Sequence, residues 1–267
     1  KKLFVAFEAQ GTDVGEIKVF ENRFAPLRHL YVSPHGNNTS GDGSYLQPYK
    51  TIQYAINSLT NNGGTISVSA GTYVENINYN GKNLVIKGEN MKTTIIDGDN
   101  KGATVTMEEA SLNGFTIING SSGAVSGNKH SVINNCLIIN NNSPSNLLID
   151  AGKIENVVIT NNTSRGFIQL WPNGLINHVT IRNNNSTSDF LLNIIYSGGV
   201  IKNSIVWGNT RKSTVGTIFI ETPDAFKTIS HSIIEGPLPY ELMGEGVMNI
   251  DPEFCDTLSS TYFDTSP

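Results

Sequence analysis

Hydrophobic and polar positions alternate in this chain within a six-residue segment that recurs six times. The copies begin at residues 112, 133, 154, 176, 201 and 229, so their starts lie 21, 21, 22, 25 and 28 residues apart. A unit this short cannot bury an apolar face by itself, and it becomes stable when equivalent units stack on one another. The spacing therefore predicts a solenoid of stacked coils.

The first, fourth and sixth positions of the segment predict its inward face. The first and sixth positions are Leu, Ile or Val in every copy, and the fourth becomes smaller toward the C-terminus. The fourth and sixth positions are two residues apart, so both point to the same side of a strand. The first column is Leu112, Ile133, Ile154, Ile176, Ile201 and Ile229, the fourth is Phe115, Cys136, Val157, Val179, Ser204 and Ser232, and the sixth is Ile117, Ile138, Ile159, Ile181, Val206 and Ile234.

Two columns of turn-forming residues separate the strands. The third position of the segment holds Gly, Asn or His, which accept left-handed backbone or bond their own main chain. A second column follows two residues after the sixth position, and we predict that its stacked amides form a hydrogen-bonded ladder. The third position is Gly114, Asn135, Asn156, His178, Asn203 and His231, and the second column is Asn119, Asn140, Asn161, Asn183, Gly208 and Gly236.

These strands have an apolar period of two between bends, which differs from the helical period of 3.6. The signature of leucine-rich repeats is absent, so the pattern predicts an all-β chain folded as a parallel β-helix. After Pro48, Thr51 can cap a short helix that covers the first coil and prevents end-to-end association, so we expect a monomer. Residues 1–29 are expected to be N-terminal strands, a linker or a cap with a β-hairpin, and residues 30–267 the β-helix domain.

A family resemblance covers most of the chain. Residues 31–89 resemble the N-terminal part of right-handed β-helix proteins of the pectin-lyase-like superfamily, and residues 204–209 (SIVWGN) and 251–256 (DPEFCD) resemble secreted bacterial members with a downstream sorting domain. The resemblance implies right-handed coils, a secreted or cell-surface location and a domain truncated at its C-terminus. It implies no single reaction, because the superfamily includes lyases, hydrolases, epimerases, tailspikes and adhesins.

The sequence predicts different environments for the two cysteines. Cys136 lies in the inward fourth column and is predicted to be a buried small hydrophobe. Cys255 belongs to the DPEFCD segment, which in similar proteins is followed by a Ser-Pro-Cys segment, so the resemblance implies a disulfide partner outside this chain. A bridge between Cys136 and Cys255 is the alternative.

Composition limits the partners of the protein. Charged residues make up 15% of the chain and the net charge is −5, which argues against nucleic acid. No run of eighteen apolar residues occurs, so no membrane-spanning segment is expected.

One predicted outward row combines rings with carboxylates. Counting back from each repeat places Asp150, Trp171, Tyr196 and Glu221 on four successive rungs. Aromatic rings bind the C–H faces of sugars and carboxylates accept hydroxyl hydrogen bonds, so we predict polysaccharide binding there, the alternative being rings that only cover their own sheet. The two acids would lie about 14 Å apart, too far for the 5 to 9.5 Å of a glycosidase pair, and the row therefore favours binding without catalysis.

A second outward row places Arg182, Trp207 and Glu235 on consecutive rungs, with Trp207 as a further ligand-binding candidate on which a sugar can stack. In polysaccharide lyases of the superfamily, an Arg or Lys removes the proton beside a uronate carboxylate, often with calcium bound nearby. Arg182 and Glu235 are therefore the catalytic candidates if the protein is a lyase, and a solvent-facing Arg–Glu pair beside Trp207 is the alternative.

Calcium has no clear ligand cluster in the sequence. Acidic residues gather with glycine at Asp97–Asp99 and at Asp42, and Asp251 lies in the C-terminal segment, but all three places are typical of turns. We therefore expect no metal site and no cofactor, with calcium as the alternative if the protein is a lyase.

Overall fold

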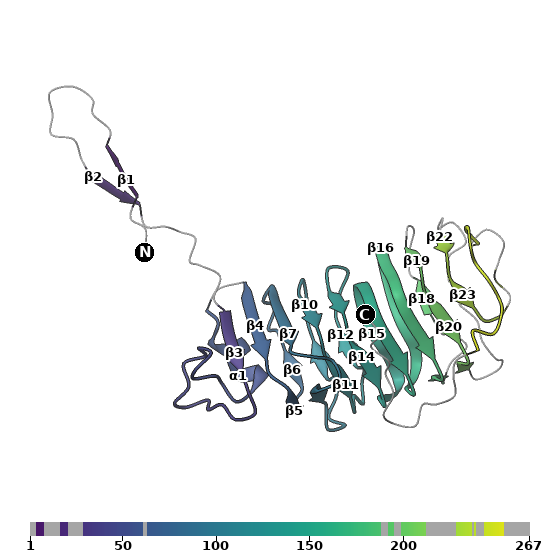
Figure 1. Ribbon diagram of the computed structural model, residues 1–267, viewed down its shortest axis with the longest axis horizontal. Coiled ribbons are helices and arrows are strands. Elements are labelled where there is room, and N and C mark those ends of the chain that lie inside the picture. Colours follow the sequence, from purple (N-terminus) through teal and green to yellow (C-terminus); the bar gives the residue numbers. More distant parts are fainter. Residues whose placement is uncertain are drawn as a thin grey trace.

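The structure is a computed structural model that describes residues 4–7, 17–20, 29–60, 63–187, 192–194, 199–211, 228–236, 238 and 243–253. Strands β3 to β23 stack side by side along the long axis of the molecule (Figure 1). All pairings among these strands are parallel and join equivalent positions of successive coils. The predicted all-β parallel β-helix is confirmed. No helix among the described residues is long and apolar enough to cross a membrane.

Each coil contributes to three ladders of parallel strands. The first ladder contains the first position of the repeat and crosses the molecule in the order β3, β4, β7, β10, β13, β15, β16, β19 and β22. Its strands are β3 (His29–Val32), β4 (Gly64–Val68), β7 (Leu84–Gly88), β10 (Ser111–Asn113), β13 (Val132–Asn134), β15 (Asn142–Thr160), β16 (Thr163–Arg182), β19 (Val200–Lys202) and β22 (Thr228–Ser230).

The second and third ladders complete the coil. The second contains the sixth position of the repeat, and β15 and β16 belong to all three ladders because each runs through a whole coil. The second ladder adds β5 (Gly71–Val74), β8 (Thr94–Asp97), β11 (Thr116–Ile118), β14 (Leu137–Ile139), β20 (Ile205–Trp207) and β23 (Ile233–Ile234). The third ladder adds β6 (Ile77–Asn78), β9 (Val105–Thr106), β12 (Val125–Ser126) and β18 (Leu192–Ile194). In addition, β16 pairs with β17 (Asn185–Ser186), and β17 pairs with β21 (Thr210–Arg211).

The predicted inward columns form the core. All eighteen residues of the first, fourth and sixth positions are at most 4% exposed. The two late serines of the fourth column are buried without an unpaired hydroxyl, because Ser204 Oγ donates to the Lys202 carbonyl at 2.7 Å and Ser232 Oγ to the Ser230 carbonyl at 2.7 Å. The inward face predicted from the repeat is therefore confirmed.

Both predicted turn columns have left-handed backbone. The third position has φ between 48° and 82°, and the second column has φ between 53° and 92°. The prediction that this second column forms the amide ladder is wrong by one residue. A left-handed residue turns the chain so that its successor faces inward, and the buried amides are those of Asn141, Asn162, Asn184 and Asn209.

The buried ladder links four successive coils through identical contacts. The Nδ2 group of Asn141, Asn162 and Asn184 donates to the Oδ1 atom of the next member, each time at 2.9 Å. Asn162 Nδ2 also donates to the carbonyls of Ile138 and Thr160, at 2.9 Å each, while Asn162 Oδ1 accepts the backbone N–H of Asn141. The ladder thus satisfies backbone groups that the sharp turn leaves without a strand partner.

Helix α1 (Ile52–Ser58) covers the first coil, as predicted, and packs against β3, β4 and β6. Its N-cap is Thr51, and the Glu75 carboxylate accepts the N–H groups of Ile52 and Gln53 at 2.9 Å each. At the other end, Lys82 Nζ donates to two carbonyls of the last turn, Ile56 and Leu59. Residues of the β-helix itself therefore hold both ends of the helix in place.

Two further strands precede the solenoid. Strands β1 (Phe4–Phe7) and β2 (Ile17–Phe20) pair antiparallel, with Phe4 opposite Phe20, in agreement with the predicted hairpin. Whether residues 1–29 act as strands of another unit, a linker or a cap stays a prediction.

Cys136 is a free, fully buried thiol, as its column predicts. Its Sγ donates to the Asn134 carbonyl at 3.2 Å, the same contact that the serines of this column make in later coils. Burial raises its pKa to about 11. Cys255 lies outside the described residues, so its pairing stays a prediction.

We predict that Asn162→Ala lowers the free energy of unfolding by at least about 3 kcal/mol, because it leaves several buried donors and acceptors without partners. Urea denaturation followed by circular dichroism measures the change. Asn142→Ala is the matched control, since Asn142 is an exposed strand residue next to the ladder. Equal stability of the two variants would contradict an energetic role for the ladder.

We also predict that Cys136 does not react with a thiol-specific reagent at pH 8 in the folded protein, because the reactive thiolate is scarce below a pKa of about 11. The measurement uses a Cys255→Ser background, so that only one thiol is counted. Full reaction is expected after unfolding in urea. Rapid modification of the folded chain would show that this part of the core opens readily.

Candidate polysaccharide-binding site

The candidate site centres on a contact between two adjacent coils. Asp150 lies in β15 and Trp171 in β16, and Trp171 Nε1 donates to Asp150 Oδ1 at 2.5 Å. Both side chains are half-buried. Burial raises the pKa of the Asp150 carboxyl from its ordinary value of 3.8, and the hydrogen bond from Trp171 opposes that rise. We call this unit the Asp150–Trp171 pair.

The strand register differs from the predicted row. Asp150 lies opposite Gln169, whose side chain is half-buried, and Gln169 pairs with Asn193 in the strand register. Ile149 aligns with Ile168, two residues before the position that simple counting gives. The prediction that Asp150 and Trp171 occupy equivalent positions is therefore wrong, although their side chains meet.

Two compensating changes in coil length explain the difference. Between β15 and β16 the aligned residues are 21 apart at Asn142, 19 apart at Ile149 and 22 apart at Lys153. Residues 171–174 of β16 thus stand opposite the single residue Gly152, and they bulge from the regular coil. The bulge carries Trp171 past the rung of Asp150, from where its indole N–H reaches back to the carboxylate.

Sequence reasoning missed Gln169, although a local signal was present. Trp171 is followed by Pro172-Asn173-Gly174, residue types that mark turns, and Asn173 has a φ of 59°. An irregularity at that point could have been inferred, and with it a shift of the register before it. Tyr196 and Glu221, the other predicted members of the row, lie outside the described residues.

The second predicted row is in register. Arg182 lies opposite Trp207, and the neighbouring strand pair β20 and β23 continues the alignment toward Glu235. All three side chains are half-buried. The carboxylate of Glu235 accepts the backbone N–H of Gly208 at 2.7 Å, so it stabilises the turn of the preceding coil.

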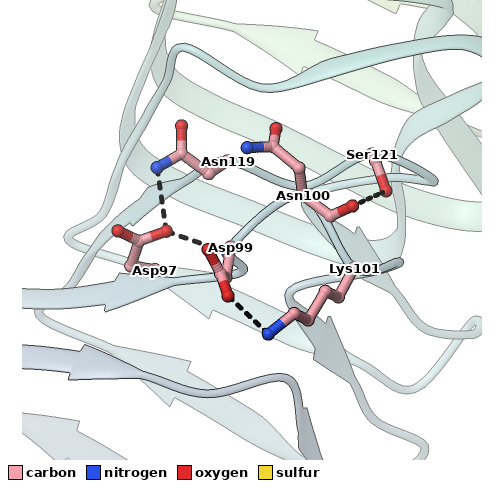
Figure 2. Close-up of polar contacts among 6 residues, drawn as sticks. All are labelled: Asp97, Asp99, Asn100, Lys101, Asn119 and Ser121. Atoms are coloured by element: carbon pink, nitrogen blue, oxygen red, sulfur yellow. Dashed lines mark hydrogen bonds and ion pairs between the residues drawn. The ribbon is translucent and has the colours of Figure 1, made fainter.

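The acidic segments form turns, as expected. Figure 2 shows that Asp97 Oδ1 accepts the N–H of Asp99 at 2.9 Å and the Asn119 amide at 2.8 Å, while Asp99 pairs with Lys101. Asp42 and Asp251 likewise accept the N–H two residues ahead. Across the described ranges, no three His, Cys, Asp or Glu side chains gather in a way that could hold a metal ion.

Solved structures share this architecture. A pectin methylesterase from Aspergillus niger aligns with a TM-score of 0.50 and 17% identity over 86% of this chain and 83% of that chain. The chain therefore shares the parallel β-helix fold of this enzyme. Pectin methylesterases from carrot (TM-score 0.47, 17% identity, 88% and 80% covered) and Erwinia chrysanthemi (0.44, 13%, 83% and 81%) also align. No family model and no curated protein matches the sequence. At these identities the likeness concerns the fold alone.

The hydrogen bond of the Asp150–Trp171 pair can be tested by substitution of the ring. We predict that Trp171→Phe raises the pKa of Asp150 further, because it removes the hydrogen bond that favours the charged carboxylate. A carbon-detected NMR titration of the carboxyl group measures the shift. Trp207→Phe, which changes a ring in another row, should leave the pKa unchanged.

The raised pKa of Asp150 also determines how the free energy of unfolding changes with pH. Because the folded-state pKa of Asp150 is raised, the protonated carboxyl favours the folded chain. The contribution of Asp150 to the free energy of unfolding is therefore greatest below pH 3.8, the ordinary pKa, and it is lost as the pH rises through the folded-state pKa. Asp150→Asn should remove this part of the pH dependence, and an unchanged profile would contradict the assignment.

Proposed function

We propose that the chain is a secreted or cell-surface β-helix module that binds a polysaccharide along an outer sheet face without catalysing a reaction on it. The observation that supports this most is the Asp150–Trp171 pair. A half-buried indole ring is held by its N–H against a carboxylate, next to the amide of Gln169. A ring fixed in this way loses little freedom when a sugar stacks on it, and the neighbouring oxygen and amide groups can bind hydroxyls.

The surroundings of Asp150 support binding over hydrolysis. A glycoside hydrolase needs two carboxyl groups about 5 to 9.5 Å apart. The residue opposite Asp150 on the next rung is Gln169, whose side chain is an amide. One oxygen of Asp150 is also committed to the Trp171 N–H. The described part of this row therefore offers one carboxylate and no partner acid.

A polysaccharide lyase that cleaves a uronate polymer by β-elimination is the alternative. Arg182 and Trp207 lie on adjacent rungs, which would place a cation and a ring beside the same polymer. Glu235 is the other candidate for this reaction, but its carboxylate already accepts the Gly208 N–H. The alternative predicts an unsaturated product that absorbs ultraviolet light.

The choice of test polymers follows from the comparisons. Pectin methylesterases act on pectin, so pectin with high and low methyl content belongs in the panel beside neutral plant and bacterial polysaccharides. Released methanol and ultraviolet absorbance are recorded with and without calcium. These readouts separate binding from ester hydrolysis and from β-elimination.

We predict that Trp171→Ala weakens retention of the bound polysaccharide about tenfold or more in affinity electrophoresis, with no product formed by either protein. Tyr54→Ala is the matched control, because Tyr54 is an exposed ring on α1, outside both outward rows. Product formation that Arg182→Ala abolishes would favour the lyase. Retention that is equal in the native chain and in Trp171→Ala would overturn the proposed site.

A further inference from the structure

One row of polar residues follows the outward side of the third ladder. Strands β6, β12, β15 and β16 carry it along the axis (Figure 1), with β9 paired to β6 and β12. Each member directly follows an inward residue that is at most 1% exposed, and each is itself exposed or half-buried. We call this set the third-ladder row, and its members are Asn78, Thr106, Ser126, Asp150 and Gln169.

The strand register places these residues on successive rungs. Thr106 lies opposite both Asn78 and Ser126, and Asp150 lies opposite Gln169. The register of β12 and β15 brings Ser126 beside Asp150. Five rungs extend over about 19 Å at the usual spacing of neighbouring strands. The row is therefore a continuous polar strip parallel to the axis.

Polar side chains over the first ladder, by comparison, are already paired with one another. The Glu155 carboxylate pairs with Lys153 at 2.7 Å and accepts the amide of Asn177 at 3.3 Å. The Oδ1 atom of Asn177 in turn accepts the amide of Asn203 at 3.0 Å. A ligand that bound these groups would have to replace contacts that the protein makes with itself.

Most polar side chains of the third-ladder row have no such commitment. The hydroxyls of Thr106 and Ser126 and the amide of Gln169 make no hydrogen bond to another residue within the described part of the chain. In solution these groups bind water, which the hydroxyls of a ligand can replace without the loss of a protein contact. The row therefore presents donors and acceptors that are available for binding.

Neighbouring side chains hold the row near both of its ends. At the first rung, Gln53 of α1 donates to the Asn78 carbonyl at 3.0 Å and accepts the Asn78 N–H at 2.6 Å. Three rungs farther along, Trp171 Nε1 donates to Asp150 Oδ1 at 2.5 Å. A stacking ring thus lies beside an ordered line of hydrogen-bonding groups that runs back toward the helix.

We propose that the third-ladder row is the part of the polysaccharide-binding site that determines how long a ligand it takes. The glycan lies parallel to the axis, one sugar stacks on Trp171, and the following sugars donate and accept hydrogen bonds at Ser126, Thr106 and Asn78. This inference rests on the proposed function, because Trp171 is the anchor of the ligand. It extends that function by naming the orientation of the ligand and the residues that bind beyond the ring.

The charge of the row favours a neutral linear glycan. Asp150 is its one ionisable member and would be an anion, and none of the five members is a cation. A uronate chain would gain no ion pair along this strip and would face a like charge at Asp150, which reduces affinity. The rungs are about 4.8 Å apart, close to the advance per sugar of an extended β-1,4-linked chain, so successive rungs can meet successive sugars.

The test compares short and long probes on the full chain. Disaccharides and hexasaccharides of β-1,4-linked glucose, xylose and mannose are the neutral probes, and hexagalacturonate is the charged probe. Calorimetry measures affinity, and the NMR signal of the Trp171 indole N–H reports where the probe binds. At least one neutral sugar is expected to shift that signal, with its hexasaccharide bound about tenfold or more tighter than its disaccharide.

Substitutions separate the row from the ring. Thr106→Val combined with Ser126→Ala should weaken hexasaccharide binding about tenfold and leave disaccharide binding unchanged, whereas Trp171→Ala should weaken both. Ser111→Ala combined with Thr180→Val is the matched control, because it removes half-buried hydroxyl groups from the first and second ladders. This control should bind like the native chain, and circular dichroism melting checks that every variant is folded.

The outcomes distinguish the two proposals. If no probe shifts the Trp171 signal, the proposed function and this inference are both overturned. The inference alone is overturned if probes bind at Trp171 but the hexasaccharide binds no tighter than the disaccharide, or if the Thr106 and Ser126 variant binds like the native chain. Tighter binding of hexagalacturonate than of every neutral hexasaccharide would also overturn it.

Discussion

The fold depends on hydrogen bonds between successive coils, because a parallel strand has no partner within its own coil. The asparagine ladder extends this dependence to the turns, where strand pairing ends. Asn162 donates to carbonyls of its own and the preceding coil and to the amide of the next one, and it accepts from Asn141. Every coil is thereby held at a fixed place over its neighbours. Between β15 and β16, changes in length occur where the strand pairing is interrupted.

The interruptions lie at the corners between ladders. The spacing of 22 residues between the third and fourth copies of the repeat looks almost constant, yet it conceals a shortening near residues 143–147 and a lengthening at residues 171–174. The first removes residues before the third ladder and the second adds them after it. A corner can therefore carry a new side chain such as Trp171 while the strands on both sides keep their buried rows.

The fold was predictable from the sequence because its chemistry is local and repeated. A column of Leu, Ile or Val must be inward, and a column of Gly, Asn or His must turn, whatever the neighbouring coils do. The ladder was misplaced by one residue because residue type alone does not tell whether the left-handed Asn161 or its successor Asn162 faces the core. Burial decides it: Asn162 is 1% exposed and Asn161 lies at the surface.

The candidate site was less predictable, because it depends on register and on loops. Counting residues assumes coils of equal length, and that assumption failed between Asp150 and Trp171.

One corner of the coil recurs at the same position along the first ladder. Asn83, Glu109 and His130 each precede the outward row of the first ladder by two residues, and Asn173, in the bulge of Trp171, holds the same position before Leu175. These corner residues are exposed, whereas the residue that follows each of them is buried. Substitutions at this corner can alter what the surface binds at little cost in stability. A chain-like ligand parallel to the axis would pass the corners of successive coils in order, so its length would determine how many of them it contacts.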